Sequence, residues 1–215
     1  MMNAAAGIFL AARRKPKLPY DAVEWLGVDS TSYKPYINTA VSVVSSNGFS
    51  IRTRVYYSTF TQYAGFFGDY QNETTNTVRM LLTGTDNDTC YVCAGGRANS
   101  AMGFSLAKNA WHDVSLNTTD MSAIVDNVSK TQDTVGRQNN SPLLLFTQNR
   151  ALSIKTGRIG FFQIFHNGIL LRDFLPVKFS NEQGVSEGAM YDCVSGQLFR
   201  NAGTGAFVVG PDKVA

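Results

Sequence analysis

Hydrophobic and polar residues alternate along this chain in many short runs, and the clearest run is FSIRTRVYY at residues 49–57. Successive side chains of a β-strand point to opposite faces, so alternation with a period of two predicts a strand with one buried face. The buried face is expected to carry Phe49, Ile51, Thr53, Val55 and Tyr57, and the other face Ser50, Arg52, Arg54 and Tyr56.

Similar runs follow at short intervals, and glycine, asparagine and aspartate cluster between them. These turn residues accept positive φ or bond to their own following backbone. Only the stretch around 120–135 suggests a helical turn. The pattern therefore predicts an all-β protein, an antiparallel two-sheet sandwich or jelly roll. The expected strands cover 36–44, 63–67, 77–83, 89–94, 101–106, 111–117, 122–128, 143–147, 157–166, 169–179, 189–192, 197–200 and 206–209.

The Asn167-Gly168 dipeptide separates two apolar runs, residues 157–165 and 169–177. Because both residues accept positive φ, the dipeptide predicts a tight hairpin that makes the two runs neighbouring strands. Pro176 is expected to end the second strand or to place it at a sheet edge, since proline has no amide hydrogen to donate.

The run over residues 189–211 contains turn residues in two clusters and no helical pattern. Short apolar pieces separated in this way predict rim hairpins that close the sandwich. Asp192 is expected to cap the turn at residues 194–196. Arg172 or Arg158 is expected to pair with a partly buried acid and so to fix the order of the strands.

The chain has 215 residues, of which 44% are hydrophobic and 16% charged, enough for one sizeable core. Its net charge is +3, but residues 1–20 contain four basic residues and no acid. Removing these four charges leaves −1 for residues 21–215. This near neutrality argues against a nucleic-acid-binding face on the domain.

Residues 1–20 are expected to form a separate segment, followed by one domain over residues 21–215. The basic residues of the segment follow its apolar run, and the run is too short to cross a bilayer, so neither a secretory signal nor a membrane span is expected. A frayed tail or short helix is one interpretation. The other is a segment that docks on a partner protein, burying Ile8, Phe9 and Leu10 and placing Arg13 and Arg14 against an acidic surface.

Several segments, taken in order, carry a resemblance to a known family. They are LPYDAVEWLGVDSTSYKPYINTAVS (18–42), WHDVSL (111–116), Val125-Asp126, LLLF (143–146), GRIGFFQIFHNGILLRDFLPV (157–177) and GAMYDCVSGQLFRNAGTGAF (188–207). Together they resemble the concanavalin A-like (laminin G-like) jelly-roll domains. The chain departs from this family at Asn38-Thr39-Ala40, where the family usually has Asp-Thr-Gly.

The resemblance implies a jelly roll of two antiparallel sheets with a non-enzymatic structural or recognition role. Such domains occur in gut-bacterial surface proteins and in phage tail or fibre-associated proteins. We therefore expect a phage virion component, such as a tail fibre, spike or capsid decoration protein. It would display a lectin-like domain to a host-surface glycan and contact other virion proteins through residues 1–20, as a monomer or a homo-oligomer. The alternative is a carbohydrate-binding adhesin on a bacterial cell surface.

The acidic residues and histidines do not form a catalytic pattern. Jelly-roll glycosidases commonly present Glu-x-Asp-x-Glu on one strand, and none of the four glutamates forms it. His112 follows Trp111, which is expected in the core, and His166 precedes a turn. Both histidines are therefore expected to be structural or at the surface, and no enzymatic activity is expected.

The three cysteines are expected to be structural, because an odd count argues against a disulfide framework. Cys90 and Cys93 are expected on opposite faces of one strand, because their spacing is odd. Calcium is the one cofactor with candidate ligands, which are the oxygens of Asp69 and of residues 86–88. The simpler interpretation is an ordinary turn with no cofactor.

Residues 57–72 combine aromatic rings with aspartate, asparagine and glutamine, the combination expected of a sugar-binding surface. Rings can stack on sugar faces while the polar groups bind hydroxyls. The candidate ligand-binding residues are Tyr57, Tyr63, Asp69, Tyr70 and Asn72. The alternative is a structural stretch in which Phe66 and Phe67 are divided between the core and the rim.

Overall fold

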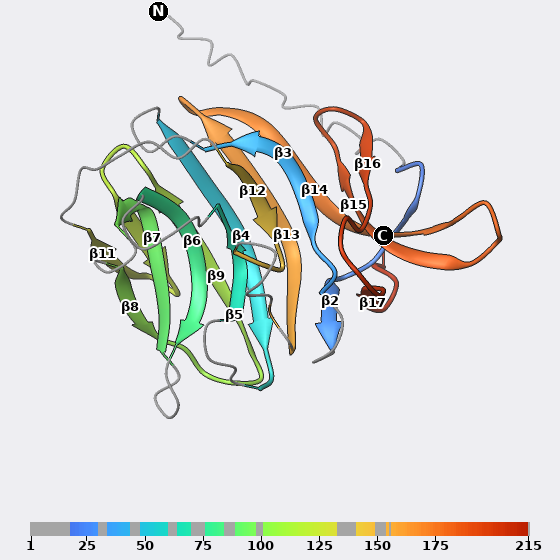
Figure 1. Cartoon of the computed structure of the whole chain (residues 1–215), viewed down its shortest axis with the longest axis horizontal. Coiled ribbons are helices and arrows are strands. Elements are labelled where there is room, and N and C mark those ends of the chain that lie inside the picture. The colour runs from blue at the N-terminus through green and yellow to red at the C-terminus, as the bar shows by residue number, and fades with distance from the viewer. Residues whose placement is uncertain are drawn as a thin grey trace, which may run out of the picture.

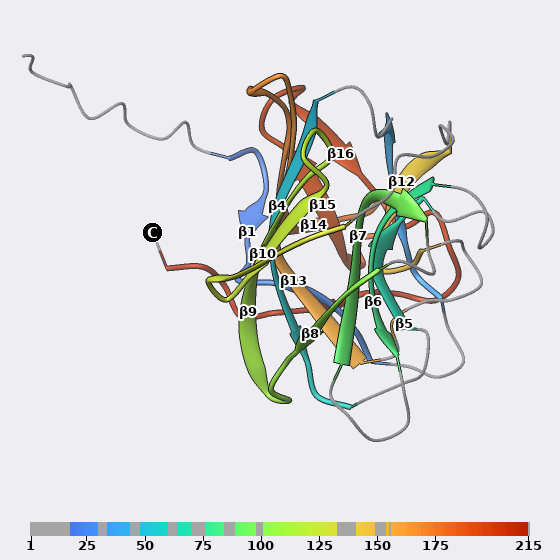
Figure 2. The same cartoon turned by 90° about the vertical axis from the view of Figure 1, so that its left-hand side faces the viewer.

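The computed structural model describes residues 18–29, 34–43, 48–59, 64–69, 76–83, 89–97, 101–132, 141–148, 154 and 156–214. These residues form two antiparallel β-sheets and contain no helix. The sheets lie in two layers, seen face-on in Figure 1 and edge-on in Figure 2. The expected all-β class is therefore confirmed as a two-sheet architecture. Within the described ranges there is accordingly no helix long and apolar enough to cross a membrane.

The larger sheet contains eleven of the described strands. They are β1 (Asp21–Ala22), β2 (Leu26–Asp29), β4 (Phe49–Tyr57), β9 (Ala110–Asn117), β10 (Ser122–Val125), β11 (Val128–Thr131), β13 (Thr156–His166), β14 (Ile169–Ser180), β15 (Ser186–Asp192), β16 (Gln197–Phe199) and β17 (Val208–Val209). Eight of them follow the order β11-β10-β9-β4-β13-β14-β15-β16. Beside this path β1 pairs with β14, and β2 pairs with both β13 and β17.

The smaller sheet contains six described strands. They are β3 (Ile37–Ser42), β5 (Ala64–Gly68), β6 (Asn76–Thr83), β7 (Thr89–Arg97), β8 (Met102–Ser105) and β12 (Pro142–Leu145). Their order is β3-β12-β5-β6-β7-β8, so the two neighbours of β12 are far from it in the sequence. All the pairs are antiparallel.

The main core fills the space between the sheets. Strand β4 alternates as its sequence predicts, because its five odd-numbered side chains, from Phe49 to Tyr57, are at most 7% exposed. Across the layers, Phe67 of β5 meets Phe162 of β13 edge to face, with ring centroids 5.2 Å apart. Rings in this arrangement attract each other beyond the area they bury, so the contact helps to hold the layers together.

Strands β13 and β14 form the predicted hairpin, in which Asn167 and Gly168 have φ values of 50° and 78°. The expectation that Pro176 ends β14 or marks an edge is wrong, because β14 continues to Ser180 and pairs there with β15 on one side and with β1 on the other. The Pro176 carbonyl accepts a hydrogen bond from the Val23 amide. The proline nitrogen faces the same side, away from β15, so its missing hydrogen interrupts no bond to that strand.

Residues 120–132 form no helical turn. They contain the β10–β11 hairpin, whose turn residues Asp126 and Asn127 have φ values of 47° and 69°. A two-residue hairpin turn of this kind needs positive φ at both positions, and short Asx side chains tolerate it. The strand expected over 122–128 therefore ends at Val125.

The two ends of the described chain pair with each other at the edge of the larger sheet. Residues 22–27 run antiparallel to residues 208–213 in one continuous register, which includes β2, β17 and a bridge between Val23 and Asp212. At the outer end of this pairing, the Lys213 amide donates to the Ala22 carbonyl at 2.9 Å. The predicted closing role of the final run is confirmed.

Asn201 links the turn at residues 201–205 to the segment just before β3 of the smaller sheet. Its Oδ1 accepts hydrogen bonds from the amides of Tyr36 and Gly203. A Cβ atom on Gly203 would lie 2.0 Å from the Lys34 carbonyl oxygen, so the close approach requires glycine.

Asp192 has the predicted capping role. Its buried carboxylate accepts from the amides of Val194 and Ser195 and from the Ser195 hydroxyl. Of the two arginines expected to pair with an acid, Arg172 is the one that pairs with Asp192. Its Nε lies 3.6 Å from Asp192 Oδ2. The pair links β14 to β15, which confirms the expected pairing of an arginine with a buried acid.

Candidate functional site

A β-bulge in β13 turns two consecutive phenylalanines to opposite sides of the larger sheet. The register with β4 shifts between Ile159 and Phe161, so Gly160 has no partner residue in β4. As a result Phe162 is fully buried between the sheets. Phe161 is half-buried on the outer face, by which we mean the side of the larger sheet turned away from the smaller sheet.

Four side chains form a row across the outer face, which we call the aromatic row: Trp25, Arg158, Tyr56 and Trp111. Each is half-buried. The Arg158 guanidinium carbon lies 4.1 Å from the Trp25 ring centroid and 4.6 Å from that of Tyr56. The Tyr56 and Trp111 centroids are 5.6 Å apart, and the two residues are partners in neighbouring strands. The row is thus held by β13, β4 and β9 together with the residue before β2.

Two polar pairs lie on the same strands, next to the aromatic row. Arg54 of β4 is opposite Asp113 of β9, and Arg52 is opposite Ser115. Positions two residues apart on one face are separated by roughly 7 Å. The Arg54 Nε lies 3.7 Å from Asp113 Oδ1, and Phe161 is the partner of Arg54 on its other side. The outer face therefore combines rings, charges and hydroxyls in one ordered array.

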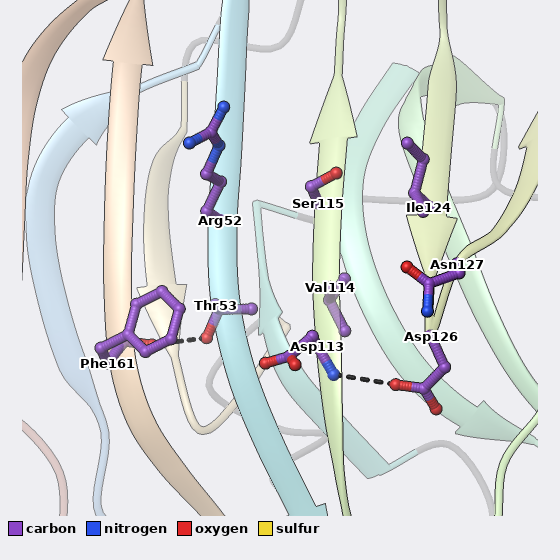
Figure 3. A pocket seen from close by; sticks show the side chains of 9 residues that line it. All are labelled: Arg52, Thr53, Asp113, Val114, Ser115, Ile124, Asp126, Asn127 and Phe161. Carbon is purple, nitrogen blue, oxygen red and sulfur yellow. Dashed lines mark hydrogen bonds between the residues drawn. The ribbon is translucent and has the colours of Figure 1, made fainter.

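A pocket of about 320 Å³ opens between these pairs (Figure 3). Phe161 lies on one side of it and Asn127 on the other, with Arg52, Asp113 and Ser115 between them. This volume is at the small end of the range for ligand sites in proteins. The pocket has room for one compact polar ligand such as a sugar ring.

Asp126 anchors the wall of this pocket. Its Oδ1 accepts a hydrogen bond from the Asp113 amide at 3.0 Å, and its Oδ2 lies 2.5 Å from Nδ1 of the buried His112. The other ring nitrogen of His112 lies 2.8 Å from the Ala107 carbonyl oxygen. Both carboxylates of the pocket, Asp113 and Asp126, therefore already have partners in the protein.

The structure buries two of the five predicted ligand-binding residues. Tyr57 is fully buried and donates its hydroxyl to the Leu106 carbonyl at 2.8 Å. Asp69 is 2% exposed and accepts from the Thr77 hydroxyl and the Val78 amide. The burial of Tyr57 follows the alternation predicted for residues 49–57, and both side chains turn into the protein and away from a sugar-binding surface. Neither can reach a sugar at the surface.

Phe66 and Phe67 are both fully buried, so the expected division between core and rim is also wrong. All five residues of β5 are buried, since the strand is covered on both faces. The other predicted residues lie outside the described residues and stay predictions. They are Tyr63, Tyr70 and Asn72, the docking residues Ile8, Phe9, Leu10, Arg13 and Arg14, and the turn at residues 86–88.

Trp111 lies half-buried on the outer face, so its expected position in the core is wrong. The side chains of β9 that turn inward are His112, Val114 and Leu116, so Trp111 shares the outer face with Asp113 and Ser115. The alternation within WHDVSL carried this signal, because a tryptophan in phase with an aspartate and a serine belongs to the exposed side.

Cys90 and Cys93 are buried free thiols, and burial raises the pKa of both above the ordinary value. Cys90 faces the core between the sheets, while Cys93 is not part of that core, which confirms the expectation of opposite faces. In the described ranges no three His, Cys, Asp or Glu side chains are grouped to hold a metal ion.

The stability of the protein is expected to fall as the pH rises from about 4 to about 7, because of Asp69. Burial raises the pKa of this carboxyl from 3.8 to about 7, although hydrogen bonds from the Val78 amide and the Thr77 hydroxyl partly oppose the shift. The folded state therefore keeps a proton that the unfolded chain has lost in this window, and each added pH unit favours unfolding until about pH 7.

Urea unfolding at several pH values between 4.5 and 8.5 tests this expectation against an Asp69→Asn variant. The asparagine has no proton to lose, so the free energy of unfolding of the variant should decline less over the same window. If the two proteins show parallel curves, Asp69 does not titrate as described.

The chain matches no family model, and no curated protein shows significant similarity to it.

Proposed function

We propose that this protein is a non-enzymatic glycan-recognition protein and that it binds sugars on the outer face of its larger sheet. The observation that carries the proposal is the aromatic row beside a polar pocket. Tyr56 and Trp111 are half-buried, and the exposed part of each ring offers apolar surface to the C–H groups of pyranose rings. Arg52, Ser115 and Asn127 offer donors and acceptors for hydroxyls. Regular strands hold these side chains, which favours a site that is formed before the ligand arrives.

We also propose that the sandwich is a concanavalin A-like jelly roll, as the sequence resemblance implies. Ala40 supports this assignment, because its φ of 55° lies in the left-handed region that favours glycine, and the family usually has glycine here. Asn38 Oδ1 accepts from the Ala40 amide, and the Thr39 hydroxyl donates to the Leu143 carbonyl. These bonds maintain the turned backbone and connect β3 to β12.

The setting we propose is a phage virion, in which the N-terminal segment attaches the domain to other virion proteins. The apolar and basic composition of residues 1–20 supports docking on a larger assembly. The alternative setting is the surface of a bacterium, where the same outer face would serve an adhesin. Mass spectrometry of purified particles distinguishes the two.

Replacing Trp111 by alanine is expected to weaken glycan binding by at least about tenfold, because large central aromatic residues dominate such contacts. The full-length protein is first screened on a glycan array, and the strongest ligand is then titrated by calorimetry. Trp111→Phe keeps a ring at this position and should retain most of the affinity.

Tyr191→Ala is the matched control for this experiment. It removes an aromatic side chain that packs on Tyr20 and belongs to a separate small cluster, away from the aromatic row. Its affinity should equal that of the unchanged protein. The proposal fails if no glycan binds, or if Trp111→Ala binds as tightly as the unchanged protein. Hydrolysis of a bound glycan would contradict the non-enzymatic role.

A further inference from the structure

We propose that the outer face selects glycans whose sugars carry carboxylate groups, such as uronic or sialic acid residues. This inference rests on the proposed glycan-binding function and names the class of sugar that the site takes. It is drawn from three arginines that lie on the outer face, each stacked on an aromatic ring. They are Arg52, Arg54 and Arg158.

The ring contacts do not use the N–H groups of Arg52 and Arg158, for which the described residues provide no hydrogen-bond acceptor. The guanidinium carbon of Arg52 lies 5.4 Å from the Phe165 centroid, and that of Arg54 lies 5.5 Å from the Trp111 centroid. Arg158 lies between two rings of the aromatic row. A guanidinium that rests on a ring through its flat face keeps its N–H edge free, and that edge matches the two oxygens of a carboxylate. The rings also restrict the arginine rotamers, which lowers the entropy lost on binding.

Two of these three arginines have no carboxylate partner among the described residues and are available to bind a ligand. Arg54 lies near Asp113, and the second pocket carboxylate, Asp126, is held by His112. Among the described residues, no carboxylate lies within ion-pair distance of Arg52 or Arg158. Asp113 thus has an ion-pair partner and Asp126 a hydrogen-bond partner in the protein, whereas Arg52 has neither kind of partner among the described residues.

The separation of the two arginines favours an oligosaccharide over a single sugar. Arg52 and Tyr56 are four residues apart on β4, which corresponds to roughly 13 Å, and Arg158 is the partner of Tyr56 in the next strand. The main pocket adjoins Arg52, and a second cavity of about 50 Å³ adjoins Arg158 and Trp25. A chain of acidic sugars can therefore place one carboxylate at each arginine. The net charge of residues 21–215 is −1, so this attraction is local.

The test compares the binding of two polymers to the whole chain. One is polygalacturonate, and the other is the same polymer after its carboxyl groups have been reduced. Binding is measured by calorimetry at one ionic strength near that of the cell. The acidic polymer is expected to bind at least about tenfold more tightly, the effect of one well-placed bidentate ion pair. Dextran sulfate and dextran form a second pair, which distinguishes carboxylate from sulfate recognition.

Arg52→Gln is expected to lower the affinity for polygalacturonate by about tenfold and to lower the affinity for the reduced polymer much less, because the glutamine amide still donates to hydroxyls. Arg52→Lys keeps the charge but loses the planar fork, so it should not restore the affinity. Arg200→Gln is the matched control, because Arg200 also stacks on a ring, that of Phe179, but lies outside the site. Its affinity should be unchanged.

Equal affinity for polygalacturonate and its reduced form would overturn this inference while the glycan-binding function stands. Equal losses in Arg52→Gln and Arg200→Gln would also overturn it, because they would show a non-specific charge effect. Tight binding of dextran sulfate without binding of polygalacturonate would overturn the assignment to carboxylates. Absence of binding to every polymer would overturn the inference, and the proposed function fails as well only if the glycan array also shows no ligand.

Discussion

Replacing Phe162 by alanine is expected to lower the free energy of unfolding by about 3–5 kcal/mol, the usual cost of deleting a buried phenylalanine ring. Phe162 is fully buried, and its ring meets Phe67 of the opposite sheet. The substitution opens a cavity between the two layers that close packing on both sides prevents from collapsing. Urea unfolding followed by tryptophan fluorescence measures the change.

Phe161→Ala is the matched control, since it deletes the same ring at the adjacent position. Phe161 is half-buried on the outer face, so its loss should cost much less stability. It lines the pocket, and its removal should instead weaken glycan binding. Equal destabilisation by the two substitutions would contradict the bulge that separates these residues onto opposite faces.

Asp192→Ala is expected to destabilise the protein by about 3–5 kcal/mol, because it removes one partner of a buried ion pair. The carboxylate accepts hydrogen bonds from the amides of Asp173, Val194 and Ser195 and from the Ser195 hydroxyl. Alanine would leave these donors without their acceptor and the Arg172 guanidinium without its ion-pair partner. Chemical unfolding monitored by circular dichroism gives the difference in free energy.

Asp212→Ala provides the comparison for this ion pair. Asp212 pairs with Lys178 at 2.6 Å on the surface, where water replaces the lost contact at little cost. Its unfolding curve should lie close to that of the unchanged protein. A loss in Asp192→Ala no larger than that in Asp212→Ala would show that Asp192 does not organise the β14–β15 connection.

Local sequence patterns were sufficient for the elements that depend on neighbours in the chain. The period of two in residues 49–57 predicted which side chains of β4 are buried. Asn167-Gly168 predicted the hairpin, because the conformation of a two-residue turn depends on those residues themselves. Pro176 misled because its effect depends on which side of β14 its nitrogen faces, and that follows from pairing with Val23, far away in the sequence.

The candidate site could not be predicted because it is assembled from distant segments. Trp25, Tyr56, Trp111 and Arg158 belong to four parts of the chain that become neighbours only when the larger sheet forms. The composition of residues 57–72, with many aromatic rings, predicted a sugar-binding surface within this one segment. Composition alone does not show which rings turn inward. Gly160 was the available signal for the bulge, since glycine inside a strand often marks one.

The pairing of residues 22–27 with 208–213 has a mechanical consequence. The two paired segments of the chain leave this pairing at the same end, beyond Ala22 and Lys213. A force that pulls these points apart therefore loads the hydrogen bonds one after another, as in a zipper, and not all together as in shear. A tether attached at both places would peel β17 from β2 before any load reached the packed layers. Attachment at only one of these two points leaves the pairing of β2 with β17 without load.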